Sequence, residues 1–362
     1  MTHALLTAPL TPDAMLELED DFGWRVTVLP RGSELAALAT EYADVSALVV
    51  EAERVDAATI DAFPKLSLIA CLRGTPVNVD VDHATSRGIP VIYTPGRNAE
   101  SVADLVLGLM YSCVRQIARA HHLVVSRELT EEREERPGRK DVVWRPSDPS
   151  GVVPYLEFKG PELSRLTLGL LGFGAIGRRV GSKAVALGMR VVVHDPFVDG
   201  GLIIRSGCEP ISFDALFAES DVLSLHAPGQ NGTPLVGRDQ LGSMKPTSYL
   251  INTARASVLD YDALLAALQA GRLAGAGLDV FPDEPLSSRN PMLELPNVTL
   301  TPHIGGASAN VIEHQSELLL HSMRALAGEN ADAAFVHNRQ ALDALPGRIP
   351  AALRWPPAVG AR

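Results

Sequence analysis

The sequence predicts an α/β protein built from two parallel-sheet domains, Rossmann-like or flavodoxin-like, with an active-site cleft between them. Short apolar runs that are typical of strands alternate with helix-like segments in both halves of the chain. The length of 362 residues also fits two domains, since one domain takes about 150 residues.

Composition and charge narrow the class of protein. Hydrophobic residues make up 46% and charged residues 21% of the chain, as in ordinary globular proteins, which argues against wholesale disorder or a fibrous repeat. The net charge of −11 repels phosphate backbones and anionic lipid surfaces. We therefore expect neither nucleic acid nor a membrane as the main partner.

The cysteines and the N-terminus indicate a reducing compartment. Cys71, Cys113 and Cys208 form no C-x-x-C pair, so neither a disulfide framework nor a cysteine zinc site is expected. Residues 1–10 lack the basic and long apolar regions of a secretion signal. The longest apolar stretch, 105–114, is shorter than the roughly 20 residues that span a bilayer. We expect a cytoplasmic protein.

The first half of the chain reads as strands joined by helical or polar segments. Ser101 and Asp104 have the spacing of a helix start and precede an apolar run and an amphipathic stretch, which together predict one long helix over about 101–123 that crosses between the domains. The predicted strands are Ala47–Val50, Leu66–Leu72 and Ile89–Tyr93.

The second half repeats the alternation and ends in a helix at about 309–326. The charged and proline-rich segment 127–160 predicts a surface loop, with a regulatory or partner-binding arm as the alternative. The tail 343–362 is expected to be poorly ordered. The predicted strands are 168–171, 191–194, 222–226, 249–252, 277–280 and 298–300.

A glycine-rich turn between a strand and a helix predicts a dinucleotide site. The turn reads Gly172-Phe173-Gly174-Ala175-Ile176-Gly177, and Asp195 closes the next strand. The glycines allow a tight turn, close approach of a pyrophosphate and close helix packing, while helix N–H groups bind the phosphates. Asp195 would accept hydrogen bonds from the ribose hydroxyls and repel a 2′-phosphate, which favours NAD over NADP.

Four further blocks carry a family resemblance: 94–103, Asn252-Thr-Ala-Arg255, Leu278-Asp-Val-Phe-Pro-Asp-Glu-Pro285 and Thr301-Pro-His-Ile-Gly-Gly306. With the glycine turn, they resemble the D-isomer-specific 2-hydroxyacid dehydrogenases, and the phosphoglycerate-dehydrogenase-like branch most of all. The resemblance implies an NAD-binding domain at 102–308 and a discontinuous substrate-binding domain at 1–101 and 309–342. It also implies a homodimer formed through the NAD-binding domain.

The resemblance implies three catalytic residues. Arg255 would bind the substrate carboxylate and carbonyl, His303 would exchange the proton, and Glu284 would partner that histidine. The chemistry agrees, because hydride transfer to a 2-oxo acid leaves an alkoxide, and histidine, with an unperturbed pKa of about 6.5, suits its protonation. A carboxylate orients the imidazole and favours its charged form, and a guanidinium grips a carboxylate through two parallel hydrogen bonds.

The same resemblance implies further cofactor-binding residues, and no cluster has the ligand spacing of a metal site. These residues lie in the glycine turn, at five later places in the chain and in the helix predicted to cross between the domains. They are Gly172, Phe173, Gly174, Ala175, Ile176, Gly177, Asp195, His226, Ala227, Pro228, Thr253, Ala254, Asp279, Gly305 and Val102.

The predicted substrate loop departs from the family pattern. Arg73 and Thr75 stand at the usual glycine positions, and Pro76 removes one backbone N–H. Arg73 could bind a second anionic group, while Asn78 and Asn98 could bind hydroxyls, which favours a sugar acid or a phosphorylated hydroxy acid. The predicted substrate-binding residues are Arg73, Gly74, Thr75, Asn98 and Arg255. A second departure, Ala256 in place of glycine, is expected to be tolerated.

The sequence leaves other functions open. Within the family, glyoxylate or hydroxypyruvate reduction is the alternative. A formate- or phosphite-type enzyme is a further possibility, although formate enzymes typically carry glutamine where this chain has Glu284. From a different class, the fold also serves NAD(H)-binding sensors that resemble corepressors. A complete set of Arg255, Glu284 and His303 argues against that interpretation.

Overall fold

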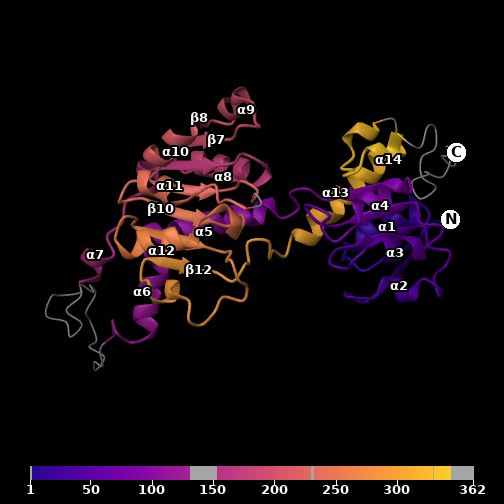
Figure 1. The fold of residues 1–362 in the computed structure, drawn as a ribbon, viewed down its shortest axis with the longest axis horizontal. Coiled ribbons are helices and arrows are strands. Elements are labelled where there is room, and N and C mark those ends of the chain that lie inside the picture. The colour runs from indigo at the N-terminus through magenta and orange to yellow at the C-terminus, as the bar shows by residue number, and fades with distance from the viewer. Residues whose placement is uncertain (1, 131–152, 230–231, 329, 344–362) are drawn as a thin grey trace, which may run out of the picture. The chain divides into compact units, whose positions relative to one another are not determined.

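The computed structural model describes residues 2–130, 153–229, 232–328 and 330–343. It divides the chain into two compact units (Figure 1). Unit 1 runs to Asn98 and resumes at Ala307, and unit 2 comprises Ala99–Gly306. The sequence predicts these two boundaries after residues 101 and 308, a few residues further along the chain than the divisions after Asn98 and Gly306.

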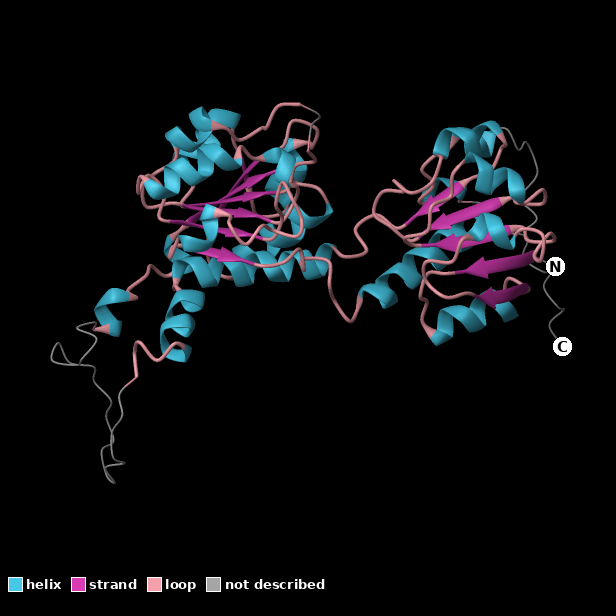
Figure 2. Ribbon diagram, turned by 60° about the horizontal axis from the view of Figure 1, so that its bottom comes forward, coloured by secondary structure: helices cyan, strands magenta, loops and turns pink. Residues whose placement is uncertain are grey.

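Unit 1 is built on a five-stranded parallel sheet with the order β2-β1-β3-β4-β5. Helices cover both faces of this sheet (Figure 2). Its elements are β1 (Thr2–Leu6), α1 (Pro12–Asp20), β2 (Trp24–Val28), α2 (Leu35–Leu38), β3 (Ala47–Val50), α3 (Ala57–Ala62), β4 (Leu68–Cys71), α4 (Val81–Ser86), β5 (Val91–Tyr93), α13 (Val311–Ala327), η4 (Ala331–Ala333) and α14 (Gln340–Asp343).

The central strands of unit 1 are apolar along their whole length because both of their faces are covered. Since successive strand residues point to opposite faces, Val49 packs in one core with Leu319 and Met323 of α13. Its neighbour Leu48 packs in the other core with Ile60 of α3. Helix α13, from the last part of the chain, is thus part of the first core.

Unit 2 is built on a seven-stranded parallel sheet with the order β12-β11-β10-β9-β6-β7-β8. Its elements are α5 (Ala99–Val114), α6 (Ile117–Val125), α7 (Pro154–Glu157), η1 (Leu163–Arg165), β6 (Thr167–Leu171), α8 (Ala175–Ala186), β7 (Arg190–His194), α9 (Gly200–Arg205), β8 (Glu209–Pro210), α10 (Phe213–Glu219), β9 (Val222–Leu225), α11 (Arg238–Ser243), β10 (Tyr249–Asn252), η2 (Ala256–Val258), α12 (Tyr261–Gln269), β11 (Gly275–Leu278), η3 (Pro291–Glu294) and β12 (Val298–Leu300).

The chain order reverses between β6 and β9, which are hydrogen-bonded neighbours although β7 and β8 lie between them in sequence. Such a reversal leaves a crevice beside the carboxyl ends of the strands, where open α/β sheets bind their ligands. Every motif singled out in the second half of the sequence lies at or directly after such a strand end.

Three sequence-based expectations for the elements of unit 2 were wrong in detail. The long helix begins at Ala99, so Ser101 lies inside α5 and is not its cap. It ends before Gln116, which has a left-handed φ of 49°, and α6 follows at a bend of 67°. Strand β11 begins at Gly275 and ends at Leu278, earlier than expected. The insertion at 127–160 and the tail at 343–362 fall largely outside the described residues.

Gly277 lies within β11 where α5 packs against this strand. A Cβ on Gly277 would lie 3.0 Å from Cβ of Leu109 in α5 and 2.9 Å from a methyl group of Ile251 in β10. The missing side chain therefore lets α5 pack directly on the strand.

Among the described helices, none by itself has the length and apolar character to cross a membrane, and α5 and α6 meet that test only as a bent pair.

Candidate active site

The glycine turn joins β6 to α8 at the reversal point of the sheet. Gly172 has a φ of +100°, and a Cβ there would lie 2.8 Å from the backbone of both His226 and Ala227. Only glycine fits between this turn and the end of β9. A Cβ on Gly174 would meet no atom within 4 Å. The turn is therefore closed toward the sheet and open on the side where a phosphate would approach the N-terminus of α8.

Asp195 follows β7 and lies beside this turn. Its Oδ2 accepts the N–H of Phe173 at 2.7 Å, and its Oδ1 accepts the N–H of Phe197 at 2.9 Å. A carboxylate has about four acceptor positions, so capacity remains for ribose hydroxyls. A cation near the turn could attract the 2′-phosphate of NADP and so weaken a preference for NAD. Arg179 of α8 is such a cation, but its Nε donates to Glu100 at 2.9 Å.

Two buried polar atoms at neighbouring strand ends have no hydrogen-bond partner within the described part of the chain: Nδ1 of His226, after β9, and Oγ1 of Thr253, after β10. The other ring nitrogen of His226 lies 2.9 Å from the Ser224 hydroxyl, and burial lowers the pKa of His226 to about 4. The histidine is therefore neutral at physiological pH. Unsatisfied buried polar groups cost about 1–3 kcal/mol, and these atoms, with the open turn and Asp195, fit a bound dinucleotide.

His303 and Glu284 form the central pair of the site. Nδ1 of His303 lies 2.7 Å from Oε2 of Glu284, and Oε1 accepts the N–H of Phe281 at 3.0 Å. The hydrogen bond with His303 is the main cause that lowers the pKa of Glu284, assisted by the Phe281 N–H and the charge of Arg255. The side chain of His303 is 51% exposed. This geometry orients the imidazole through Nδ1, and the half-exposed ring is accessible from outside the protein.

Asp279, at the end of β11, holds the loop that carries His303. Asp279 is buried, with 1% of the residue exposed. Oδ1 accepts the Thr301 hydroxyl at 2.6 Å and the N–H of Ile304 at 2.8 Å, and Oδ2 accepts the N–H of Gly305 at 2.8 Å. His303 has a left-handed φ of 55°, which costs energy in a residue with a side chain. These three hydrogen bonds stabilise that conformation.

Val102 and Gly305, which are far apart in sequence, meet next to Asp279. A Cβ on Gly305 would lie 3.5 Å from a methyl group of Val102 and 3.0 Å from Oδ2 of Asp279. Val102 is buried on α5. The structure thus brings together three of the residues expected to bind the cofactor, although a direct contact of Asp279 with the nicotinamide stays a prediction.

A pocket of about 600 Å³ lies in front of the pair and is lined by Arg255, Ala256, Ser257, Leu259, Val280, Phe281, Pro282, Glu284 and His303. The side chain of Arg255 is exposed, and one of its terminal nitrogens donates to the main-chain oxygen of Ala254 at 2.6 Å. The other nitrogens of the guanidinium fork can face the pocket. All three residues expected to be catalytic therefore line one concave site within unit 2.

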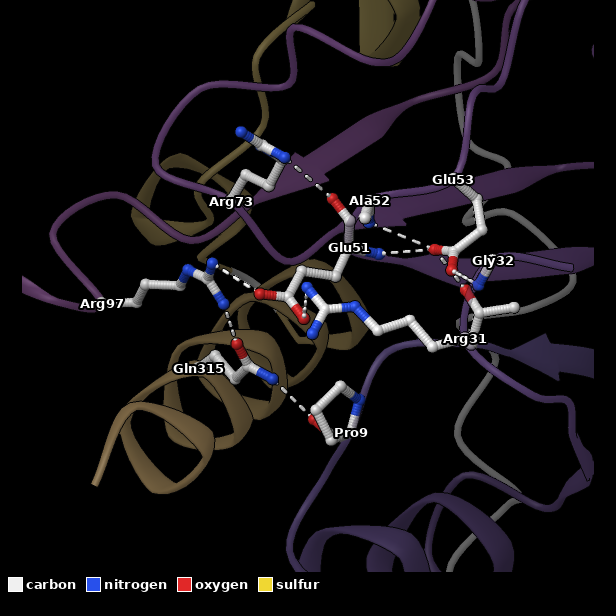
Figure 3. A network of polar contacts seen from close by, with 10 residues as sticks. Pro9, Arg31, Gly32, Glu51, Ala52, Glu53, Arg73, Arg97 and Gln315 are labelled. Atoms are coloured by element: carbon white, nitrogen blue, oxygen red, sulfur yellow. Dashed lines mark hydrogen bonds and ion pairs between the residues drawn. The ribbon is translucent and has the colours of Figure 1, made fainter. Parts of the chain in front are cut away.

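The residues expected to bind substrate from unit 1 lie near the carboxyl end of its own sheet. Arg73 follows β4, and its guanidinium reaches the main-chain oxygen of Glu51 at 3.5 Å, at the limit of a hydrogen bond (Figure 3). Gly74 and Thr75 are exposed. Asn98 is the last residue of the first segment of unit 1. Asn78, which was expected to bind substrate hydroxyls, donates to the main-chain oxygen of Glu53 at 2.7 Å and therefore holds the loop.

Sequence reasoning missed the polar network around Arg73. Glu51 accepts Arg97 at 2.7 Å and lies 3.5 Å from Arg31, and Arg97 also binds Gln315 of α13 (Figure 3). This network joins the loop after β3 to the C-terminal helix. No periodicity or short motif signals it, because its members come from distant parts of the chain.

Within the described residues, no group of His, Cys, Asp or Glu could hold a metal ion.

The strand order, the glycine turn with its acidic partner and the histidine–carboxylate pair beside an arginine define a dinucleotide-dependent dehydrogenase. Residues 107–305 match the profile of the D-isomer specific 2-hydroxyacid dehydrogenase NAD binding domain. The chain belongs to this family, as the sequence predicted, and is an NAD-dependent oxidoreductase.

Relatives within the family differ in name. A glyoxylate reductase of Thermococcus litoralis is 35% identical over 82% of this chain and 85% of its own length. A D-3-phosphoglycerate dehydrogenase of Mycobacterium leprae is 34% identical over 78% of this chain but only 49% of its own length. Among solved structures, the TT0316 protein of Thermus thermophilus has a TM-score of 0.71 and 33% identity, covering 92% of this chain and 99% of that one.

Proposed function

We propose that this enzyme interconverts a D-2-hydroxy acid and its 2-oxo acid by hydride and proton transfer. The observation that carries the proposal is the 2.7 Å contact between His303 and Glu284 at the wall of a pocket that Arg255 also lines. The nicotinamide, when bound, supplies or accepts the hydride. The residues described below bind and orient the acid and move the proton.

Each residue has one task in the proposed reduction. Arg255 binds the planar carboxylate of the 2-oxo acid through its guanidinium fork. His303, as the imidazolium, donates the proton on Nε2 to the oxygen that becomes the hydroxyl. Glu284 stabilises that positive charge and keeps Nδ1 protonated. In the reverse direction, the neutral imidazole takes the hydroxyl proton.

For the substrate, we propose a 2-hydroxy acid with a second anionic or strongly polar group, such as a phosphorylated hydroxy acid or a sugar acid. Arg73 supports this, because among the described residues its guanidinium forms no ion pair and its hydrogen bond goes to a carbonyl at 3.5 Å. The names of the relatives support both a phosphorylated acid and the alternative, glyoxylate or hydroxypyruvate.

The test is NADH oxidation with glyoxylate, hydroxypyruvate, phosphohydroxypyruvate and a sugar-derived 2-oxo acid, for the wild-type protein and for His303→Ala and Arg73→Ala. We expect His303→Ala to lose turnover with every acid. Arg73→Ala should lose kcat/KM selectively for the phosphorylated or sugar-derived acid. Tight NADH binding without turnover would instead favour the sensor, and equal effects of Arg73→Ala on all acids would contradict its assigned role.

We also propose a homodimer formed through unit 2 and a cytoplasmic location. The family resemblance supports the dimer. The three cysteines support a reducing compartment, since all are free and buried, and burial raises the pKa of the Cys71 and Cys113 thiols to about 12. Light scattering after size exclusion should give twice the mass of 38.6 kDa, and a monomer would contradict the dimer.

A further inference from the structure

The loops that carry Arg255 and Glu284 follow different strands, β10 and β11, yet the proposed reaction needs them at a fixed separation. Asn252, the last residue of β10, holds the first loop. Its Oδ1 accepts the N–H of Ala254 at 3.1 Å, and its Nδ2 donates to the main-chain oxygen of Arg255 at 3.1 Å. Because the Asn252 side chain is fully buried, water does not compete for these hydrogen bonds.

Tyr261, the first residue of α12, continues this network toward the second loop. Nδ2 of Asn252 lies 3.4 Å from the Tyr261 hydroxyl. That hydroxyl donates a short hydrogen bond to the main-chain oxygen of Val280, directly after Asp279. Tyr261 is thus hydrogen-bonded to the residue that fixes the arginine loop and to the backbone that leads to Glu284.

The peptide group between Val280 and Phe281 completes the connection. Its oxygen accepts from Tyr261, and its N–H donates to Oε1 of Glu284 at 3.0 Å, while Oε2 binds His303. A hydrogen bond to a peptide oxygen polarises the peptide and strengthens its N–H as a donor. A continuous chain of hydrogen bonds therefore runs from the Arg255 loop to the catalytic imidazole.

We propose that Tyr261 is a positioning residue of the active site, whose hydroxyl fixes the arginine that binds the oxo acid relative to the carboxylate that orients His303. This inference rests on the proposed function. Burial raises the pKa of Tyr261, and the charge of Glu284 adds to this effect. The hydrogen bond with Asn252 offsets only part of it. The hydroxyl therefore stays a donor throughout the working pH range of the enzyme.

The test compares Tyr261→Phe, which deletes only the hydroxyl, with the matched control Tyr249→Phe. Tyr249 begins β10, at the opposite end of the strand from Asn252. We expect Tyr261→Phe to lower kcat/KM for the oxo acid by about three- to tenfold, the effect of losing the hydrogen bond that the hydroxyl donates to Val280, with KM for NADH unchanged. The control should match the wild type. Equal kinetics of all three proteins would overturn the proposal.

A double-mutant cycle separates positioning from a general loss of structure. Glu284→Ala removes the acceptor of the Phe281 N–H, so Tyr261→Phe should cost less activity in that background than in the wild type. Strictly additive effects of the two substitutions on activity would overturn the positioning role of Tyr261. A rise in KM for NADH that parallels a lower melting temperature would overturn it as well.

A third measurement makes the test independent of turnover. Oxamate, an unreactive analogue of a 2-oxo acid, should bind the NADH-loaded wild type more tightly than the loaded Tyr261→Phe protein. A wild type that reduces no acid would contradict the proposed function. In that case, equal affinities for oxamate would separately overturn the role of Tyr261.

Discussion

His303 contacts the carboxylate of Glu284 through its Nδ1 atom. Glu284 has a lowered pKa because of its hydrogen bond with His303, so it is ionised at any pH at which the reduction is measured. An ionised carboxylate at 2.7 Å stabilises the imidazolium that donates the proton. Because both side chains remain partly exposed, solvent screening moderates this effect.

Glu284→Gln should therefore narrow the pH range of oxo-acid reduction. Glutamine retains an oxygen for the Phe281 N–H but removes the negative charge that favours a protonated neighbour. We expect the alkaline limb of the kcat profile to move to lower pH. The pH profile of NADH oxidation measures this, and an unchanged profile would remove Glu284 from the mechanism.

We expect Asp195 to set the preference for NAD over NADP through a local interaction of the same kind. Asp195→Ala removes the negative charge that would repel a 2′-phosphate and the acceptor for the ribose hydroxyls. We expect the ratio of kcat/KM for NADH to that for NADPH to fall by about tenfold or more, a free-energy change of about 1.4 kcal/mol. A variant that keeps the wild-type ratio would refute the assigned role.

At the scale of elements, the turn between β6 and α8 contains one glycine that the fold needs and one that the fold itself does not need. Gly172 faces the end of β9 and has no room for a side chain, whereas Gly174 faces open space. Two glycines of one motif are thus required for different physical reasons. The sequence predicts the motif, and only the packing of the neighbouring strand shows which glycine the fold itself needs.

Gly172→Ala and Gly174→Ala should consequently have opposite profiles. The first adds a methyl group 2.8 Å from backbone atoms at a φ of +100°, and we expect it to destabilise the protein by about 1–3 kcal/mol or more. The second should leave the melting temperature unchanged and weaken NADH binding. Thermal melts and NADH fluorescence titrations measure both effects. Equal melting temperatures of the two variants would contradict this assignment.

At the scale of the whole molecule, carboxylates that accept hydrogen bonds or pair with cations couple the fold to pH. Burial alone would raise the pKa of Glu53, but hydrogen bonds from the Gly32 N–H, Thr7 and nearby backbone N–H groups lower it overall. Ion pairs or hydrogen bonds likewise lower the pKa of Asp44, Asp61, Glu100 and Glu209. These groups bind protons more weakly in the folded chain than in the unfolded one.

The sign of the resulting pH dependence follows. A carboxylate whose pKa is lowered by folding stabilises the folded chain. This stabilisation is complete above the pKa that the group has in the unfolded chain, about 4 to 4.5. It is lost as the pH falls through the folded value. Stability should therefore decrease below about pH 5, and Glu53→Gln, which loses the charge but keeps an acceptor, should flatten this decrease. Urea melts from pH 7 to pH 3 measure it, and identical slopes for both proteins would contradict the role of Glu53.

The sequence by itself determined the parts of this protein that local chemistry encodes. The glycine turn followed by Asp195, the order of the apolar strands and the blocks around Arg255, Glu284 and His303 predicted the two-sheet fold, the family and the cofactor. The strands Ala47–Val50, Tyr249–Asn252 and Val298–Leu300 were predicted with the bounds that the structure has. They are short apolar runs whose character does not depend on their neighbours.

Tertiary structure decided what depends on atoms that are distant in the chain. The close packing of α5 on β11 depends on the missing side chain of Gly277. The conformation of His303 depends on Asp279, and the link between the Arg255 and Glu284 loops depends on Tyr261. Hydrogen bonds and close packing are short-ranged in space but not in sequence, so a pattern along the chain reveals which residues can react while the fold decides which residues hold them in place.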